Sequence, residues 1–325
     1  MNNNTAPKIT CIGGGTGLST MLRGLKRFSP NITAIVTVTD DGGGSGVLRN
    51  ELAMPPPGDI RNCLLALSNT EPTMSKLLNY RFTSGHLKGQ SFGNLFLAAM
   101  HGISGSFDEA VAKMADVLAI TGKVLPVTNE NVWLTARFAD GSQIFGESNI
   151  NYAKLRKGCR ITNVALSPNH PKALPESIQA IEEADILVLG PGSLYTSVIP
   201  NLLVDGITDA ICRCKGAKIY VSNLMTQPGE TEGYTVSDHV SALLMHSGCK
   251  LIDYCIVNSN PAPEDIVKKY KREGSQEVKC DYDVLAKLGV KVVRAPISRV
   301  REHYRHEPLA LAAVIMNIYK NNHKE

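Results

Sequence analysis

Several features that would assign this sequence to a particular class of protein are scarce or missing. Aromatic residues make up only 6% of the 325 residues, with a single tryptophan. No apolar run approaches the ~20 residues of a membrane span, and the late run LALAAVIM at 309–316 has the length of a core helix. The opening segment MNNNTAPK lacks the apolar stretch of a secretion signal. We therefore expect a soluble, cytoplasmic protein with no membrane span.

Strong charge of one sign and metal-binding cysteine patterns are also missing. The formal net charge is +4, and the one compact basic cluster, KKYKR at 268–272, is typical of a solvated helix face. We therefore expect no nucleic-acid partner. The eight cysteines form no C-x-x-C pair, and most lie in apolar runs. This pattern predicts free thiols that pack as small hydrophobic side chains, without a structural zinc site.

What the sequence does have is a repeated alternation of β-branched runs with amphipathic segments. The first unit is an apolar run at 8–12, a glycine-rich loop, and Leu18, Met21, Leu22 and Leu25 at helical spacing. Further strands are predicted at 32–38, 185–189, 218–224 and 251–258, with helices at 175–183 and through 239–245. The alternation predicts an α/β fold in which a mostly parallel sheet is covered by helices on both faces. We interpret residues 1–325 as a single domain.

One stretch departs from this alternation. In NVWLTARFADGSQIFGES at 131–148, two strand-like runs are joined at Asp140 and Gly141. Asp-Gly between such runs is a strong hairpin signal. We therefore predict a small antiparallel hairpin insertion near 124–166.

The unusual residue clusters fall directly after predicted strands. They are GGGTGLS at 13–19, TDDGGGSG at 39–46, GPGS at 190–193, NLMTQ at 223–227, and Asn258. In an open parallel sheet ligands bind beyond the carboxyl ends of the strands, where such loops meet. The glycines of any single loop also suit a tight turn, but their joint position predicts a ligand site.

The first loop matches neither common phosphate motif. It has no second glycine and lysine at P-loop spacing, and Leu18 occupies the third glycine position of the dinucleotide fingerprint. NAD is therefore a less favoured ligand. Free amides and a hydroxyl at a helix start still suit a phosphate. The candidate ligand contacts in this loop are Gly13, Gly14, Gly15, Thr16 and Gly17.

Asp40 and Asp41 stand where dinucleotide folds place an acidic ribose contact. The pair would also suit Mg²⁺ held against a diphosphate, a general base, or a simple Asp-Gly turn. Asp40 is the candidate metal ligand, and both residues are the catalytic candidates if the protein is an enzyme. Beyond them, Asp59 in PPPGDIRN is predicted to N-cap the helix that carries Arg61.

The remaining loops supply further candidate contacts. Asn94 is expected in the first turn of an apolar helix. The loop of Gly190, Gly192 and Ser193 lacks the G-x-S-x-G nucleophile elbow and is interpreted as a phosphate nest. Asn223, Thr226 and Asn258 follow later strands. Arg305 and His306 precede Pro308, the expected first residue of a helix, where cationic side chains favour a bound anion.

Taken together, these motifs resemble those of the YvcK-type gluconeogenesis factor family, which shares a superfamily with 2-phospho-L-lactate transferase. The resemblance rests on GGGTGLSTMLRGLK, AIVTVTDDGGGSG, PPPGDIRNCLLAL, FGNLFLAAM, GKVLPVT, GPGSLYTSVIPNLLV, MTQPGET and RHEPLALA. Gly44 and Val47 depart from the serine and arginine of the family's DDGGSSGRLR, which affects only the details of the second loop.

The resemblance implies a Rossmann-like fold and a nucleotide-sugar ligand, UDP-N-acetylglucosamine or UDP-glucose, with Tyr270, Arg305 and the glycine loops as contacts. It also implies a regulatory role in carbon metabolism and in cell shape or cell-wall synthesis, exerted through a protein partner; a homo-oligomer is compatible with it. The transferase branch implies the alternative, a Mg²⁺-dependent phosphotransferase acting on a nucleotide-activated donor. A shared fold does not decide between them.

Overall fold

The computed structural model describes residues 6–150, 152, 159–301 and 303–322. Its centre is a seven-stranded parallel sheet in the order β10-β9-β8-β7-β1-β2-β3. The strands are β1 (Ile9–Gly13), β2 (Ile32–Val36), β3 (Lys123–Pro126), β7 (Ile186–Leu189), β8 (Ala217–Val221), β9 (Tyr254–Asn258) and β10 (Lys291–Ala295). The central strands β1 and β7 are buried along their whole length, as their continuous apolar sequences predict for strands covered on both faces.

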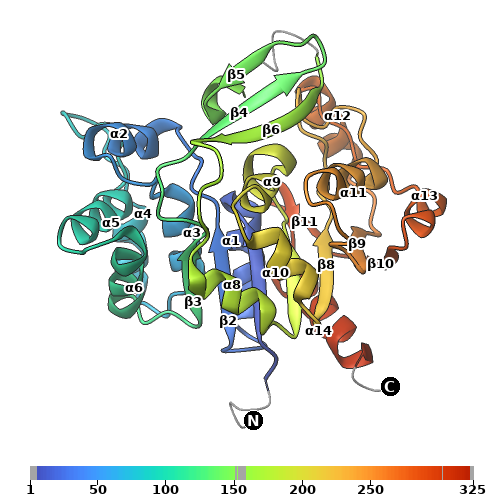
Figure 1. The fold of residues 1–325 in the computed structure, drawn as a ribbon, viewed down its shortest axis with the longest axis horizontal. Helices are drawn as coiled ribbons and strands as arrows, with labels where there is room; N and C mark the ends of the chain where they lie inside the picture. Colours follow the sequence, from blue (N-terminus) through green and yellow to red (C-terminus); the bar gives the residue numbers. More distant parts are fainter. Residues whose placement is uncertain (1–5, 151, 153–158, 302, 323–325) are drawn as a thin grey trace.

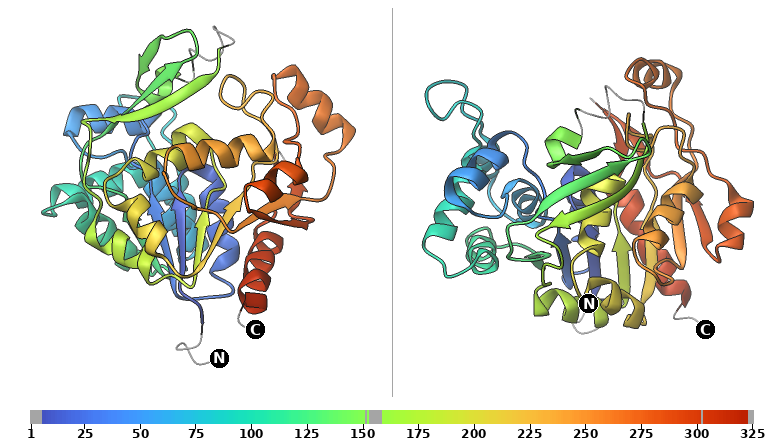
Figure 2. Two further views of the ribbon diagram at one scale, coloured as in Figure 1. Left: turned by 45° about the vertical axis from the view of Figure 1, so that its right-hand side comes forward. Right: turned by 45° about the horizontal axis from the view of Figure 1, so that its top comes forward.

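The order of the strands reverses beside β1. The chain runs from β1 to β2 and β3 on one side, and then from β7 to β8, β9 and β10 on the other. Right-handed crossovers in opposite directions place their helices on opposite faces. One face carries α1, α3 and α14, which pack together, and the other carries α8, α9 and α10 (Figures 1 and 2). The α/β fold with helices on both faces is therefore confirmed.

The helices that connect the strands are short. The longest described helix, α14, has 15 residues, and none of the helices in the described ranges is long and apolar enough to cross a membrane. The described α-helices are α1 (Gly15–Leu25), α2 (Gly43–Leu52), α3 (Gly58–Leu67), α4 (Pro72–Asn79), α5 (Phe92–Gly102), α6 (Phe107–Val117), α8 (Pro175–Glu182), α9 (Ile199–Leu202), α10 (Ile207–Arg213), α11 (Val236–Met245), α12 (Glu264–Arg272), α13 (Tyr282–Lys287) and α14 (Pro308–Asn322). A π-helical turn lies at Leu194–Val198.

The predicted hairpin is present. The strands β4 (Trp133–Phe138) and β5 (Gln143–Phe145) pair antiparallel across Gly141, whose φ is +81°. A third strand, β6 (Ile161–Ser167), pairs with β4 and completes a three-stranded sheet. The predicted range of 124–166 begins too early, because β3 belongs to the large sheet, and residues 151 and 153–158 of that range lie outside the described ones. A second hairpin joins β11 (Ser298–Val300) to β12 (Tyr304–His306).

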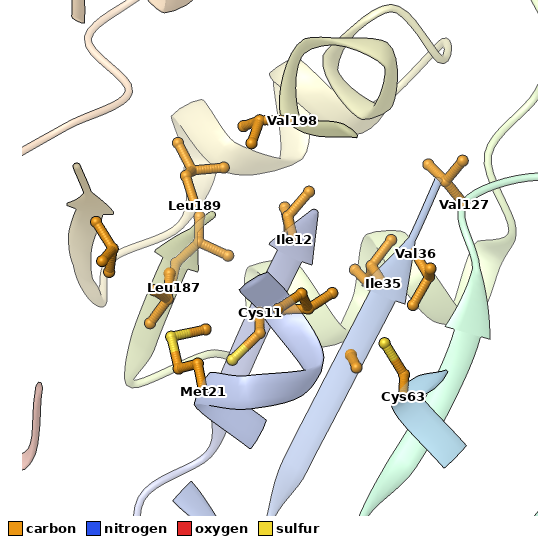
Figure 3. Packing of buried hydrophobic residues seen from close by; sticks show 14 of the residues in the cluster. Cys11, Ile12, Met21, Ile35, Val36, Cys63, Val127, Leu187, Leu189 and Val198 are labelled. Carbon is orange, nitrogen blue, oxygen red and sulfur yellow. The ribbon is translucent and has the colours of Figure 1, made fainter. Parts of the chain in front are cut away.

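The cysteine prediction is correct for the core and wrong for one pair. Cys11 and Cys63 are fully buried between the large sheet and its helices (Figure 3), where burial raises the pKa of both thiols. Cys212 and Cys249, by contrast, form a disulfide. The disulfide joins the last turn of α10 to the segment after α11. Its two cysteines are 37 residues apart in the sequence and match no spacing motif, so the sequence alone does not predict the bond.

Candidate functional site

The five predicted loops meet at the carboxyl edge of the large sheet. They follow β9, β8, β7, β1 and β2, which are five consecutive strands of the sheet, and the strand order reverses between the neighbours β7 and β1. Ligands in such folds bind at this point, because loops from the two halves of the sheet separate there and leave a crevice. The three-stranded sheet and α12 stand above this edge, one toward each side of the large sheet (Figures 1 and 2).

A cavity of about 230 Å³ lies at this edge. Its walls come from the loops after β1, β7 and β8, from α12, and from β12. The lining residues are Thr16, Gly17, Thr20, Pro191, Gly192, Ser193, Asn223, Leu224, Met225, Gln227, Tyr270, Tyr304, Arg305 and His306. The structure thus brings together seven predicted contacts, namely Thr16, Gly17, Gly192, Ser193, Asn223, Tyr270 and Arg305. Larger cavities of about 610 and 820 Å³ lie at the opposite edge of the sheet, away from these loops.

The glycines of the first loop are explained in part by contacts between loops. A Cβ atom at Gly17 would lie 2.4 Å from the carbonyl oxygen of Pro191, so only glycine lets these two loops approach each other. The helix α1 begins at Gly15, inside the loop, and not at Leu18. The Gly15 amide donates to Oδ2 of Asp59 at 2.6 Å, so this amide already has an acceptor within the protein.

Asp59 therefore acts differently from the prediction. The helix α3 begins at Gly58 with Pro57 in the N-cap position, so Asp59 lies inside the first turn and does not cap its own helix. Its carboxylate instead reaches the N-terminus of α1, where a negative charge is favourable. The sequence correctly predicted that a helix starts near Asp59, but it could not show that the Asp59 carboxylate would bond the start of α1 and not that of α3.

Four carboxyl groups gather beside this contact, and we call Asp40, Asp41, Asp59 and Glu147 the acidic group. Burial is the main cause that raises the pKa of Asp40, opposed by hydrogen bonds from the Gly42 amide and the Ser45 hydroxyl. Burial, followed by the charge of Asp40, raises the pKa of Asp59 to about 6. Burial, followed by the charges of Asp40 and Asp59, raises the pKa of Glu147 to about 8. The fold therefore holds more carboxyl groups here than can all be ionised at neutral pH without mutual repulsion.

The two adjacent aspartates have separate partners. Oδ1 of Asp40 accepts from the Gly42 amide at 2.9 Å. Oδ1 of Asp41 accepts from the Ser148 amide at 2.7 Å and from its hydroxyl at 2.6 Å. Asp41 thus holds the segment after β5 against the large sheet. Glu147 belongs to that segment, and its part in the acidic group was missed because no local signal links it to residues more than 80 positions away.

Arg49 also holds the three-stranded sheet in place. Arg49 is 1% exposed. Its guanidinium lies 3.8 Å from the centre of the Trp133 ring and donates to the carbonyl oxygens of Thr39 and Val132. Burial lowers the pKa of Arg49 to about 10. This contact joins the loop after β2 to β4 and so positions the three-stranded sheet beside the acidic group.

The other predicted contacts lie outside the cavity. Asn94, in the first turn of α5 as predicted, approaches Ser45 beside the acidic group, with 3.5 Å between Nδ2 and Oγ. Thr226 is buried and bonded to the backbone of Gln276. Asn258 donates to the Tyr304 hydroxyl at 2.9 Å and so orients a ring of the cavity. Gly13 and Gly14 lie at the end of β1, and Gly190 lies directly after β7. None of the three lines the cavity.

Only one of the two predicted cations before α14 remains charged. His306 is buried, and burial lowers its pKa to about 4, while its Nε2 bonds the Ser222 carbonyl oxygen at 3.1 Å. The expected positive charge at His306 is therefore wrong, since the ring is neutral at physiological pH. Arg305 is exposed at the cavity rim, and α14 begins at Pro308 as predicted.

These features define a class, an α/β protein with a cavity at the reversal point of a parallel sheet. Comparisons with known proteins place it further. Residues 9–298 match the family model of 2-phospho-L-lactate transferase CofD, and the chain belongs to this family.

Its relatives carry a more specific name. The chain is 48% identical to the gluconeogenesis factor of Bacillus subtilis, over 97% of this chain and 98% of the relative. It is 40% identical to the gluconeogenesis factor of Listeria innocua, over the full length of both. The crystal structure of protein BH3568 from Bacillus halodurans superposes with a TM-score of 0.93 at 44% identity, covering 96% of this chain and 100% of that one. The predicted resemblance to the gluconeogenesis factors is thereby confirmed.

Proposed function

We propose that this protein binds a nucleotide sugar, with UDP-N-acetylglucosamine and UDP-glucose as leading ligands, and regulates carbon metabolism and cell shape in the cytoplasm. The observation that carries the proposal is the composition of the cavity. Thr16, Gly192 and Ser193 line it together with Tyr270, Tyr304 and Arg305. Phosphates favour such amides and cations, and aromatic rings pack against bases or sugars.

The regulatory part of the proposal comes from the relatives, which are named gluconeogenesis factors. A ligand-binding regulator would need a protein partner to pass on its state, and cell-wall synthesis is the proposed setting. Assembly into a homo-oligomer is compatible with this role.

Arg305 provides the direct test of ligand binding. We expect the native chain to bind UDP-N-acetylglucosamine in a calorimetric titration without competition from NAD. Arg305→Met should weaken this binding by about 10-fold or more, because a charge-assisted hydrogen bond is lost. The control is Arg213→Met, since Arg213 pairs with Glu182 on the far edge of the sheet and should leave the affinity unchanged. Native protein that binds no UDP-sugar would contradict the proposal.

The acidic group favours a second candidate, a Mg²⁺-dependent phosphotransferase. No set of three or more His, Cys, Asp or Glu residues in the described ranges is arranged to hold a metal ion. Mg²⁺, however, is commonly bound by one or two carboxylates together with substrate phosphates. Asp40 and Asp59 would supply such carboxylates, and a bound cation would oppose the burial that raises the pKa of both. Bound Mg²⁺ would neutralise charge on a transferring phosphoryl group.

Phosphorus NMR separates the two candidates. UDP-N-acetylglucosamine is followed for hours with protein and Mg²⁺, alone and with candidate acceptors. A binding protein shifts or broadens the diphosphate signals without new peaks. An enzyme produces new phosphorus peaks, which Asp40→Asn should abolish by removing a metal ligand, while Asp209→Asn on the remote helix α10 should not.

A further inference from the structure

The hydroxyl group of Ser193 is held between two side chains from the loop after β8. Nε2 of Gln227 lies 2.5 Å from Ser193 Oγ, and Ser193 Oγ lies 3.3 Å from Oε2 of Glu230. A serine hydroxyl has one proton to donate. If the side-chain Nε2 of Gln227 donates to Ser193 Oγ, the hydroxyl proton of Ser193 points to Glu230. If the side-chain amide of Gln227 is turned over, the hydroxyl proton is shared between its oxygen and Glu230. In either orientation a protein oxygen takes it.

Glu230 makes this arrangement rigid. The residue is 2% exposed, and its Oε1 accepts from the Tyr195 backbone amide at 2.8 Å. Glu230 lies in a turn that is closed by the backbone amide of Gln227, which donates to Thr231 Oγ1 at 2.9 Å. Thr231 is itself fully buried. Ser193 therefore faces the cavity as a hydrogen-bond acceptor backed by a buried carboxyl group. Such a wall suits an N–H or O–H donor and disfavours a phosphate oxygen, which is itself an acceptor with negative charge.

The opposite charge lies on the β12 side of the cavity. Arg305 lines the cavity there, and we call Arg23, Arg299 and Arg305 the basic group. Burial, followed by the positive charge of Arg299, lowers the pKa of Arg23, and the charge of Arg305 acts in the same direction. The cavity is thus electrically asymmetric, with an acceptor wall at Ser193 and a cationic wall at Arg305.

We propose that the ligand lies in one orientation, with its diphosphate toward Arg305 and a hydrogen-bond donor on Ser193. This inference rests on the proposed function and corrects the interpretation of Ser193 as part of a phosphate nest. The donor is an N–H or O–H group, and it comes either from the sugar or from the N3–H of uracil. Glu230 is a positioning residue, because it acts through Ser193 and does not line the cavity itself.

The test compares three ligands on native protein and Ser193→Ala: UDP-N-acetylglucosamine and UDP by calorimetry, and inorganic pyrophosphate at millimolar concentration by phosphorus NMR. We expect Ser193→Ala to weaken UDP-N-acetylglucosamine binding by about 10-fold, the effect of one lost hydrogen bond to a buried partner, and to leave pyrophosphate binding unchanged. A sugar donor leaves UDP binding unchanged as well, whereas a uracil donor weakens UDP to the same extent. Ser68→Ala, at the end of α3 away from the cavity, is the matched control.

Two further variants test the charge asymmetry. Arg305→Met should weaken all three ligands, including pyrophosphate. Glu230→Gln should separate the ligands: it weakens UDP-N-acetylglucosamine by misplacing Ser193 and leaves pyrophosphate binding unchanged. A purely structural role of Glu230 would weaken all ligands alike.

The outcomes separate the inference from the proposed function. Native protein that binds neither UDP nor the UDP-sugar overturns both. UDP-N-acetylglucosamine binding that Ser193→Ala does not change, or a Ser193→Ala variant that loses pyrophosphate and UDP-sugar equally, overturns the orientation alone. Pyrophosphate binding that Arg305→Met leaves unchanged also overturns the proposed orientation.

Discussion

Replacing Glu147 by glutamine is expected to stabilise the ligand-free protein by about 3 kcal/mol at pH 8 and to leave its stability unchanged near pH 4.5. The folded-state pKa of Glu147 is raised from 4.5 to about 8 by burial and by Asp40 and Asp59. Between these values the unfolded chain releases the proton and the folded chain keeps it. The native protein therefore loses stability as the pH rises from 4.5 toward 8, and glutamine, which does not ionise, avoids this loss.

Urea unfolding at pH 4.5, 6 and 8 measures this effect directly. The matched control is Glu51→Gln on α2, because Glu51 is exposed and should give the same small change at every pH. A gain from Glu147→Gln that does not depend on pH would mean that packing, and not charge, is responsible. If Mg²⁺ stabilises the native protein, Glu147→Gln should reduce that stabilisation less than Asp40→Asn does, because Glu147 is protonated at neutral pH.

Gly24→Ala is expected to lower the free energy of unfolding by about 3 kcal/mol or more. A Cβ atom at this position would lie 1.9 Å from the carbonyl oxygen of Pro308 and 3.1 Å from Cβ of Ala312. The first neighbour is backbone at the start of α14, so α1 and α14 would have to separate. Because α14 follows β12, the same displacement should move Arg305 and weaken ligand binding.

Gly102→Ala is the matched control for this variant. Gly102 ends α5 and has nothing within 4 Å of its would-be Cβ, so alanine there should be neutral or gain up to about 1 kcal/mol through higher helix propensity. Thermal and urea unfolding of both variants, together with calorimetric titration of the UDP-sugar, measures the difference. Equal stability of Gly24→Ala and native protein would contradict the observed packing of α1 against α14.

The meeting of the candidate loops at one edge of the sheet could be predicted from the sequence because it depends on local order. Glycine, asparagine and aspartate clusters after apolar runs predicted the loops after β1, β2, β7, β8 and β9, and parallel strands bring such loops to one edge. Arg305 was predicted from its place before a helix start, and the family resemblance adds Tyr270. The details of charge were not accessible, as His306 shows: it reads as a cation beside a helix start, but burial keeps it neutral.

The sequence by itself determined the alternation of strands and helices, the Asp140–Gly141 hairpin and the glycine loops, because these follow from propensities and periodicities over a few neighbouring residues. Only the tertiary structure decided which distant groups meet. It paired Cys212 with Cys249, brought the Asp59 carboxylate to the Gly15 amide, and set Gly17 against Pro191. These contacts arise from packing between elements, where burial and close approach change hydrogen bonding and pKa, and no local pattern of residues records them.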